Sequence, residues 1–218
     1  MTNLNFVVRW LEMHRQWMLK ENNMKKVLLL TLAVVTAIAL LLAAAPTSPP
    51  ALPQYTADNQ LLRPENYRDW VFLSSGLGMS YSPQIGGHEM FTNVFVPQWA
   101  YQEFQKSGKW PDKSIFIVEE RDSQTKGSIN KVGHFQTDFM GMGVEVKDKS
   151  HFPEEWAYFN FGENTKSARA NPKEGCFNCH AAHAAVEHSF VQFYPTLKPV
   201  AKKFGTYNAQ RENVDGAK

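Results

Sequence analysis

The chain has 218 residues, of which 43% are hydrophobic, and its formal net charge at pH 7 is +2. Five basic and two acidic residues lie within residues 1–45, so the rest of the chain carries 18 basic and 19 acidic residues, a net charge of −1. A near-neutral body of this length without a basic stripe indicates one ordinary globular domain and excludes nucleic acid as a partner.

The N-terminal segment predicts export. Residues 27–45 are an unbroken run of apolar or small residues, which follows Met24-Lys25-Lys26 and precedes a proline-rich stretch. This order predicts a signal peptide over residues 24–45, or a membrane anchor if the run is not cleaved. Residues 1–23 precede a second methionine with its own lysine pair, and we interpret them as a gene-model extension. The expected location is the periplasm, with membrane anchoring if residues 27–45 are retained.

The remainder predicts a linker, one folded domain and a tail. Residues 46–63 are rich in polar residues and proline and lack apolar periodicity, which is typical of a linker. The domain is expected over residues 64–200, and Pro64 is expected to open a short helix. Residues 201–218 have little to bury and are predicted to form a flexible tail.

The patterns within the domain predict mainly β structure. Five segments are aromatic, β-branched or alternating and are expected to be strands: residues 91–96, 115–118, 132–140, 143–147 and 156–161. A helix from Pro97 to Lys106, ended by Gly108, is expected after the first strand. Residues 162–175 are predicted to be a polar loop. The expected fold class is therefore an antiparallel β-sheet domain with flanking α-helices, preceded by an N-terminal signal or anchor helix.

Both cysteines of the chain lie in one motif, Cys176-Phe177-Asn178-Cys179-His180, near the start of an alanine-rich segment, residues 176–186, that is expected to be helical. In a C-x-x-C-H motif each thiol bonds to the porphyrin and the histidine ligates the iron. We therefore predict one covalently bound haem c, attached by Cys176 and Cys179, with His180 as axial ligand. The second ring N–H of that histidine is expected to find an acceptor, which the sequence does not name.

Two alternatives to the haem are open at this point: a disulfide or redox pair, and a zinc site formed by both cysteines with His183 and His188. With a haem, the sixth iron position decides the function, because a second protein ligand makes an electron carrier and a vacant position makes a gas binder or catalyst. Four residues are candidates for that position, each with an ordinary explanation as loop, rim or core: His88, His134, Met140 and Met142. Seven aromatic residues suit a dry haem pocket or any β core: Phe91, Phe95, Phe116, Phe135, Phe139, Phe159 and Tyr194.

Over residues 64–199 the chain resembles cytochrome P-460 and its relative cytochrome c prime beta. The resemblance rests on an ordered set of motifs: residues 66–71, Phe91-Thr92, Lys147-Asp148 with His151-Phe152-Pro153, residues 176–182 and residues 190–195. It implies an antiparallel β fold with flanking helices, a homodimer, and one five-coordinate haem with a histidine ligand and an open distal site.

The resemblance also bears on activity. Members of the P-460 branch oxidise hydroxylamine and carry a lysine joined to the porphyrin, and this lysine aligns with Val118, which cannot form the cross-link. Members of the c prime beta branch bind nitric oxide and carbon monoxide in an apolar pocket walled by phenylalanine, with which Phe91 aligns. Phe91 and Val118 are therefore expected in the distal pocket. Asp138 and Glu145 lie near the position of the distal carboxylate of the oxidising branch, or else on a solvated strand edge.

The leading hypothesis is an exported mono-haem cytochrome that binds nitric oxide, or a similar diatomic or nitrogen-oxide ligand, at an open distal site. One alternative is a hydroxylamine or nitric oxide oxidising enzyme of the cytochrome P-460 type, which needs acceptors for electrons and protons. The other is a periplasmic electron-transfer cytochrome, which needs a distal ligand. A redox partner protein is expected for either alternative.

Overall fold

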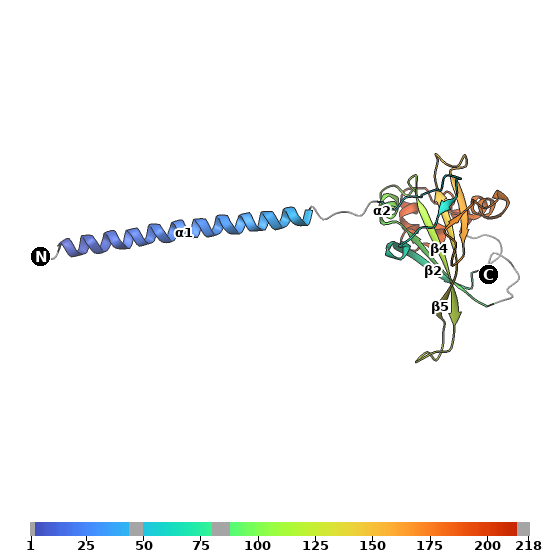
Figure 1. Ribbon diagram of the computed structural model, residues 1–218, viewed down its shortest axis with the longest axis horizontal. Helices are drawn as coiled ribbons and strands as arrows, with labels where there is room; N and C mark the ends of the chain where they lie inside the picture. The colour runs from blue at the N-terminus through green and yellow to red at the C-terminus, as the bar shows by residue number, and fades with distance from the viewer. Residues whose placement is uncertain (1–2, 44–49, 80–87, 213–218) are drawn as a thin grey trace. The chain divides into compact units, whose positions relative to one another are not determined.

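A computed structural model describes residues 3–43, 50–79 and 88–212 (Figure 1). The chain divides into two compact units, residues 1–49 and 50–218. The described part of the first unit is one continuous helix, α1 (Asn3–Ala43). Residues 44–45 of the predicted signal or anchor lie outside the described residues. Within the described ranges, no helix combines the length and the apolar character needed to cross a membrane.

The second unit is built on a five-stranded antiparallel sheet in which each strand pairs with the next along the chain. Its strands are β2 (Val71–Leu77), β3 (Phe91–Val96), β4 (Ile115–Gln124), β5 (Phe135–Lys147) and β6 (Trp156–Phe161). A two-stranded sheet joins β1 (Leu61–Leu62) to β7 (Ser167–Ala168). The hairpin of β4 and β5 extends beyond the other strands (Figure 1). This architecture, with its preceding helix, confirms the predicted fold class.

Short helices flank the sheet. They are η1 (Tyr67–Asp69), α2 (Gln98–Ser107), the π-helical turn η2 (Lys173–Phe177), α3 (Asn178–His183), η3 (Val191–Phe193), α4 (Lys198–Lys203) and η4 (Ala209–Arg211). As predicted, α2 begins after Pro97 and ends at Gly108, whose φ of 68° is the left-handed conformation that closes a helix.

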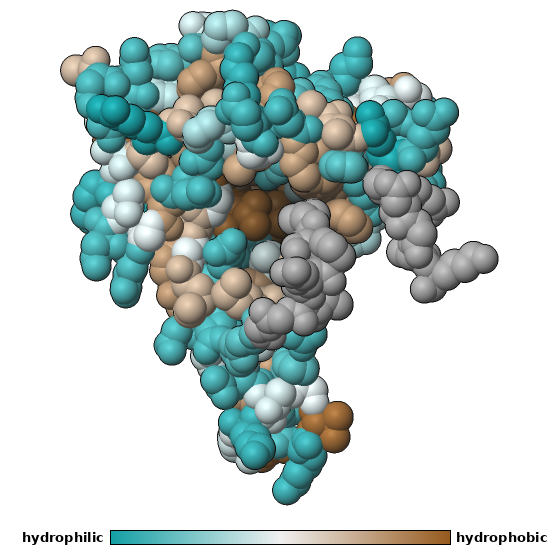
Figure 2. All heavy atoms as spheres, turned by 90° about the vertical axis from the view of Figure 1, so that its right-hand side faces the viewer, coloured by the Kyte–Doolittle hydropathy of each residue, from teal (hydrophilic) through white to brown (hydrophobic). Residues whose placement is uncertain are grey.

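Both faces of the sheet carry buried side chains, because neighbouring residues of a strand point to opposite sides. On one face Phe116 of β4 packs in a cluster with Phe104 of α2 and Leu197. On the other face Ile117 packs in a second cluster with Leu61 and Tyr67. Figure 2 shows a hollow on one face of this unit, with hydrophobic side chains at its base.

Four predicted boundaries differ from the structure. The second unit begins at Pro50, and Leu61 is 0% exposed, so residues 50–63 of the predicted linker belong to the folded unit. One strand, β5, replaces the two predicted over residues 132–140 and 143–147, because Gly141 and Met142 between them are paired with β4. The polar loop contains β7, and the helix of the cysteine motif ends at His183 rather than residue 186.

Two further segments, β2 and the predicted tail, also differ from what the sequence predicts. Strand β2 was not predicted, since its serine and glycine residues are poor strand formers that here pair with β3. In the predicted tail, Ala201 is buried, and Thr206 Oγ1 donates a hydrogen bond to the carbonyl of Gly108 at 2.7 Å. The backbone N–H of Asn208 donates to the carbonyl of Ala185 at 2.8 Å. Residues 213–218 of that tail lie outside the described residues.

Candidate functional site

A cavity of about 460 Å³ lies between one face of the five-stranded sheet and the segment that carries the cysteine motif. The sheet contributes a row of residues in which each is paired with the next across all five strands: Ser74, Val94, Val118, Gly143 and Asn160. The other wall includes Cys176, His180, Phe190, Phe193 and Tyr194. The cavity thus has a small-residue wall on the sheet and an aromatic wall beside the motif.

The cysteine motif occupies the junction between η2 and α3. Cys176 lies in η2, next to its last residue, whereas Cys179 and His180 lie in the first turn of α3. Both cysteines are free. Single π-helical turns frequently occur at functional sites, because they change the direction in which side chains leave the helix. Here Cys176 and His180 both line the cavity.

The imidazole of His180 is held by a backbone carbonyl. Its Nδ1 lies 2.8 Å from the carbonyl oxygen of His188, which can only accept, so Nδ1 is the protonated nitrogen. Its ring packs between Tyr158 and Phe190, with ring centroids 4.4 and 4.5 Å away. In the neutral imidazole Nε2 then carries the lone pair, which is the arrangement of a metal-ligating histidine with an acceptor for its second ring nitrogen.

One carboxylate faces this histidine. Oε1 of Glu145 lies 3.8 Å from Nε2 of His180, and Glu145 is 6% exposed. Its Oε2 is buried without a hydrogen-bond partner among the described residues. Burial raises the pKa of Glu145 above its ordinary value, and the nearby His180 opposes that shift. The other carboxylate singled out from the sequence, Asp138, is exposed on β5 and is not among the residues that line the cavity.

The structure places Val118 in the cavity and Phe91 outside it. Phe91 is paired with Leu77 and Arg121 at the end of β3, and the cavity is lined instead by Thr92 and Val94. Because side chains alternate along a strand, a residue one place before Thr92 points to the opposite face. The prediction of Phe91 as a wall of this pocket is therefore corrected. Phe190 and Phe193 line the pocket beside the motif, whereas Phe159 borders it from a strand position whose side chain packs in the cluster on the other face of the sheet.

The four candidates for a sixth iron ligand lie away from the cavity. Nε2 of His88 lies 2.5 Å from Asp122, and Nε2 of His134 lies 3.7 Å from Glu89. Met140 is exposed, and Met142 is buried in the cluster on the other face of the sheet. Met79 does line the cavity, and it is a residue that the sequence reading missed because it follows a strand that was not predicted. Of the seven aromatic candidates, only Phe159 and Tyr194 line the cavity.

These residues fit a haem better than the two alternatives. The thiol of Cys176 and the imidazole of His180 line a cavity whose lining is mostly small or aromatic, the second free thiol, Cys179, precedes His180 in α3, and the orphaned oxygen belongs to Glu145, which lines the same cavity. In contrast, the described residues contain no group of three or more His, Cys, Asp or Glu side chains placed to hold a metal ion. The zinc alternative, which would use Cys176, Cys179, His183 and His188, therefore has no support in the described residues.

Comparison with known proteins supports a haem at this site. The family model described as Cytochrome P460 matches residues 64–191, which include β2 to β6, the cysteine motif and the carbonyl that holds His180. A search of the curated proteins found no match. The family match covers more than half of the chain and confirms the resemblance seen in the sequence. This chain therefore belongs to the cytochrome P460 family and is a haem c cytochrome.

Proposed function

We propose that this chain is an exported cytochrome with one covalently bound, five-coordinate haem that binds nitric oxide or a similar small neutral ligand at an open distal site. The observation that supports this is the sheet wall of the cavity. Val94, Val118 and Gly143 stand in one row across β3, β4 and β5 and offer neither an iron ligand nor a hydrogen-bond donor from their side chains.

Three residues of the chain would bind the haem. Cys176 and Cys179 would hold the porphyrin, and Nε2 of His180 would bind the iron while the His188 carbonyl keeps the imidazole oriented. When bound, the haem supplies an iron with one position open to a small ligand. Val94 and Val118 offer a bound anion no partner, and Glu120 and Glu145 also line the cavity, so this wall favours neutral diatomic ligands over anions, because an unpaired charge buried there is costly.

Ligand titrations test this function. The reduced protein is expected to bind nitric oxide and carbon monoxide, while the oxidised protein binds azide only weakly. Replacing Val118 by alanine should speed carbon monoxide binding by opening the wall. Val96→Ala is the matched control, because Val96 is buried in the same sheet but does not line the cavity. A reduced haem that carbon monoxide does not change would contradict the proposal.

A specific observation supports the oxidising alternative. Glu145 places a buried carboxylate, with an oxygen free of partners among the described residues, beside Nε2 of His180, where it can accept a proton from a bound substrate. Hydroxylamine turnover with an external oxidant, lost in Glu145→Gln, would establish that function. The electron-transfer alternative would need Met79 as a ligand, since this is the methionine found among the described lining residues.

The proposal also includes a periplasmic location, with residues 24–45 as signal or anchor, and a homodimer. The β4–β5 hairpin, on which Ile129 and Val132 are each 90% exposed, offers an apolar surface for such a contact. Light scattering of the purified protein measures the dimer directly, and a monomer at all concentrations would contradict it.

A further inference from the structure

The carbonyl that holds His180 belongs to a tight turn, residues 186–189. The backbone N–H of Ser189 donates to the carbonyl of Val186 at 2.9 Å, and the N–H of Val186 donates back to the carbonyl of Ser189 at 3.4 Å. Glu187 has a φ of 51°, which is uncommon for a residue other than glycine. Such a conformation persists when surrounding contacts hold it. The position of the His188 carbonyl therefore depends on what holds this turn.

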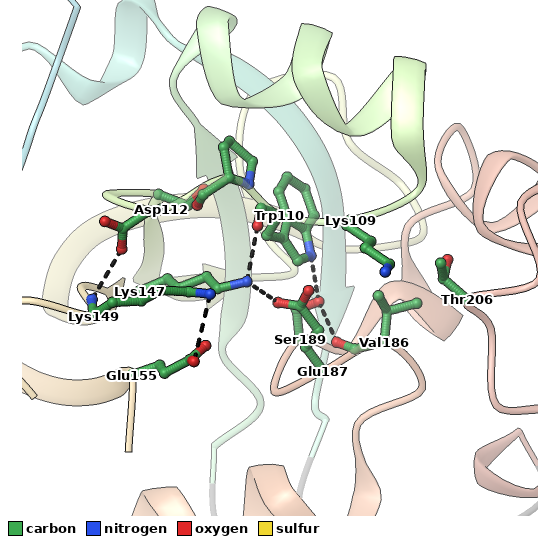
Figure 3. Close-up of polar contacts among 12 residues, drawn as sticks. Lys109, Trp110, Asp112, Lys147, Lys149, Glu155, Val186, Glu187, Ser189 and Thr206 are labelled. Atoms are coloured by element: carbon green, nitrogen blue, oxygen red, sulfur yellow. Dashed lines mark hydrogen bonds and ion pairs between the residues drawn. The ribbon is translucent and has the colours of Figure 1, made fainter. Parts of the chain in front are cut away.

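Two contacts anchor the turn from outside (Figure 3). Lys147, at the end of β5, has a side chain that is 6% exposed, and its Nζ donates to Oε2 of Glu187 at 2.6 Å and to the carbonyl of Trp110 at 2.9 Å. Nε1 of Trp110 donates to Oγ of Ser189 at 2.6 Å. Lys147 thus connects both ends of the turn, directly at Glu187 and through Trp110 at Ser189.

We propose that Lys147 and Glu187 are positioning residues for the axial histidine, acting on His180 through the His188 carbonyl; this rests on the proposed binding of haem iron by His180. Lys147 is buried but Glu187 is partly exposed, with side chains 6% and 26% exposed, so desolvation of the lysine and solvent screening leave this ion pair little net stability, and its value here is in fixing a geometry. A well-placed acceptor at Nδ1 raises the basicity of the imidazole. The ion pair thereby strengthens the bond to iron and stabilises the oxidised state.

The side chain of His188 is a separate support that the proposal does not need. Its ring packs on Phe177 at 4.6 Å and on Trp156 at 5.8 Å between centroids. His188→Ala keeps the carbonyl while it removes these contacts. We expect this variant to change the properties of the iron less than loss of the ion pair does.

The test uses the full-length protein with its haem. Lys147→Met is expected to lower the iron–histidine stretching frequency in the resonance Raman spectrum of the reduced protein and to raise the reduction potential. At the midpoint potential of the unchanged protein, the ratio of reduced to oxidised variant should rise by about threefold or more. Lys147→Arg keeps the charge and should restore most of both values. Lys113→Met is the matched control, since Lys113 pairs with buried Asp148 away from the cavity.

Glu187→Asn is the second variant, because asparagine tolerates a positive φ but has a neutral side chain that cannot form the ion pair. It should also lower the iron–histidine stretching frequency and raise the reduction potential. If Lys147→Met does not fold, Glu187→Asn decides whether the ion pair positions His180. The positioning role is overturned if Glu187→Asn leaves the stretching frequency and the reduction potential unchanged. It is also overturned if Lys113→Met changes both values as much as Lys147→Met does. An unchanged protein that shows no iron–histidine band would instead overturn the proposed function, and with it this inference.

Discussion

Val118 and Gly143 are paired directly across β4 and β5, and a Cβ added to Gly143 would lie 3.7 Å from Cβ of Val118. The space over the centre of the sheet therefore exists because one strand contributes a branched side chain and its neighbour contributes none. Val94 continues the same row on β3. This row forms the wall across the cavity from the cysteine motif, and its shape and lack of charge lead to the first two predictions.

Filling the space above Gly143 should weaken ligand binding. A leucine there adds a side chain to the space that a ligand would occupy, so the affinity of the reduced protein for carbon monoxide should fall about tenfold or more, which corresponds to about 1.4 kcal/mol. Flash photolysis measures the effect. Gly162→Ala is the control, because Gly162 lies in an exposed loop away from the cavity. Equal affinities in the leucine variant and the unchanged protein would show that ligands do not bind against this wall.

Charging the same wall should change the preference for anions. Val118 lines the cavity, so Val118→Arg introduces a guanidinium group where the pocket otherwise offers no basic side chain on its described sheet wall. Since a buried anion gains a partner, azide binding to the oxidised protein should strengthen by about tenfold. Val118→Met controls for the longer side chain without its charge. Weaker azide binding in the arginine variant than in the methionine variant would contradict the prediction.

Asp148 should make the folded unit sensitive to acid. Burial raises its pKa, but hydrogen bonds from Lys113, Ser150 and Tyr55 outweigh burial and hold the pKa below its ordinary value of 3.8. Its contribution to stability is therefore complete above about pH 4 and is lost as the pH falls through the lower folded pKa.

Asp148→Asn tests this contribution. Hydrogen bonds to a charged group contribute about 1.5–3 kcal/mol, so the variant should be less stable than the unchanged protein at pH 7 by about that amount. The difference should narrow below about pH 4, where the aspartate itself becomes protonated. Urea unfolding followed across pH measures it. A difference that stays constant down to pH 2 would mean that the carboxylate charge is not responsible.

Leu61 tests where the folded unit begins. This residue is fully buried in the cluster with Tyr67 and Ile117, so Leu61→Ala should destabilise the unit by about 2–5 kcal/mol. Leu52→Ala is the control, because Leu52 is 45% exposed and its replacement should change stability by about 0.5 kcal/mol or less. Equal, small effects in thermal unfolding would support the linker that the sequence alone predicts.

Local patterns in the sequence predicted the parts of this protein that local chemistry decides. The alternation in residues 91–96 and 156–161, and the proline and glycine that bound α2, correspond to elements with nearly the same limits. The family resemblance, which rests on short motifs in a fixed order, was confirmed. The spacing of Cys176, Cys179 and His180 gave the haem prediction, because that chemistry depends on residues that are close in sequence.

The features that the sequence could not supply depend on pairing between distant segments. The register of β3 with β4 decides whether Phe91 or Thr92 faces the cavity, because a shift of one residue exchanges the two faces of the strand. The acceptor for His180 is a backbone carbonyl, which no side-chain pattern marks. Glu145 and Asp138 look alike in the sequence and lie on the same strand, β5, yet Glu145 is buried and lines the cavity whereas Asp138 is exposed.

The absorption spectrum of the matured protein, recorded oxidised, reduced, and reduced under carbon monoxide, tests the central claim most directly. A haem ligated by His180 with an open distal site predicts a high-spin reduced spectrum that carbon monoxide changes, and His180→Ala should alter that spectrum while the haem stays attached. Sharp low-spin bands indifferent to carbon monoxide would contradict the open site, and a protein without a Soret band would contradict the haem itself.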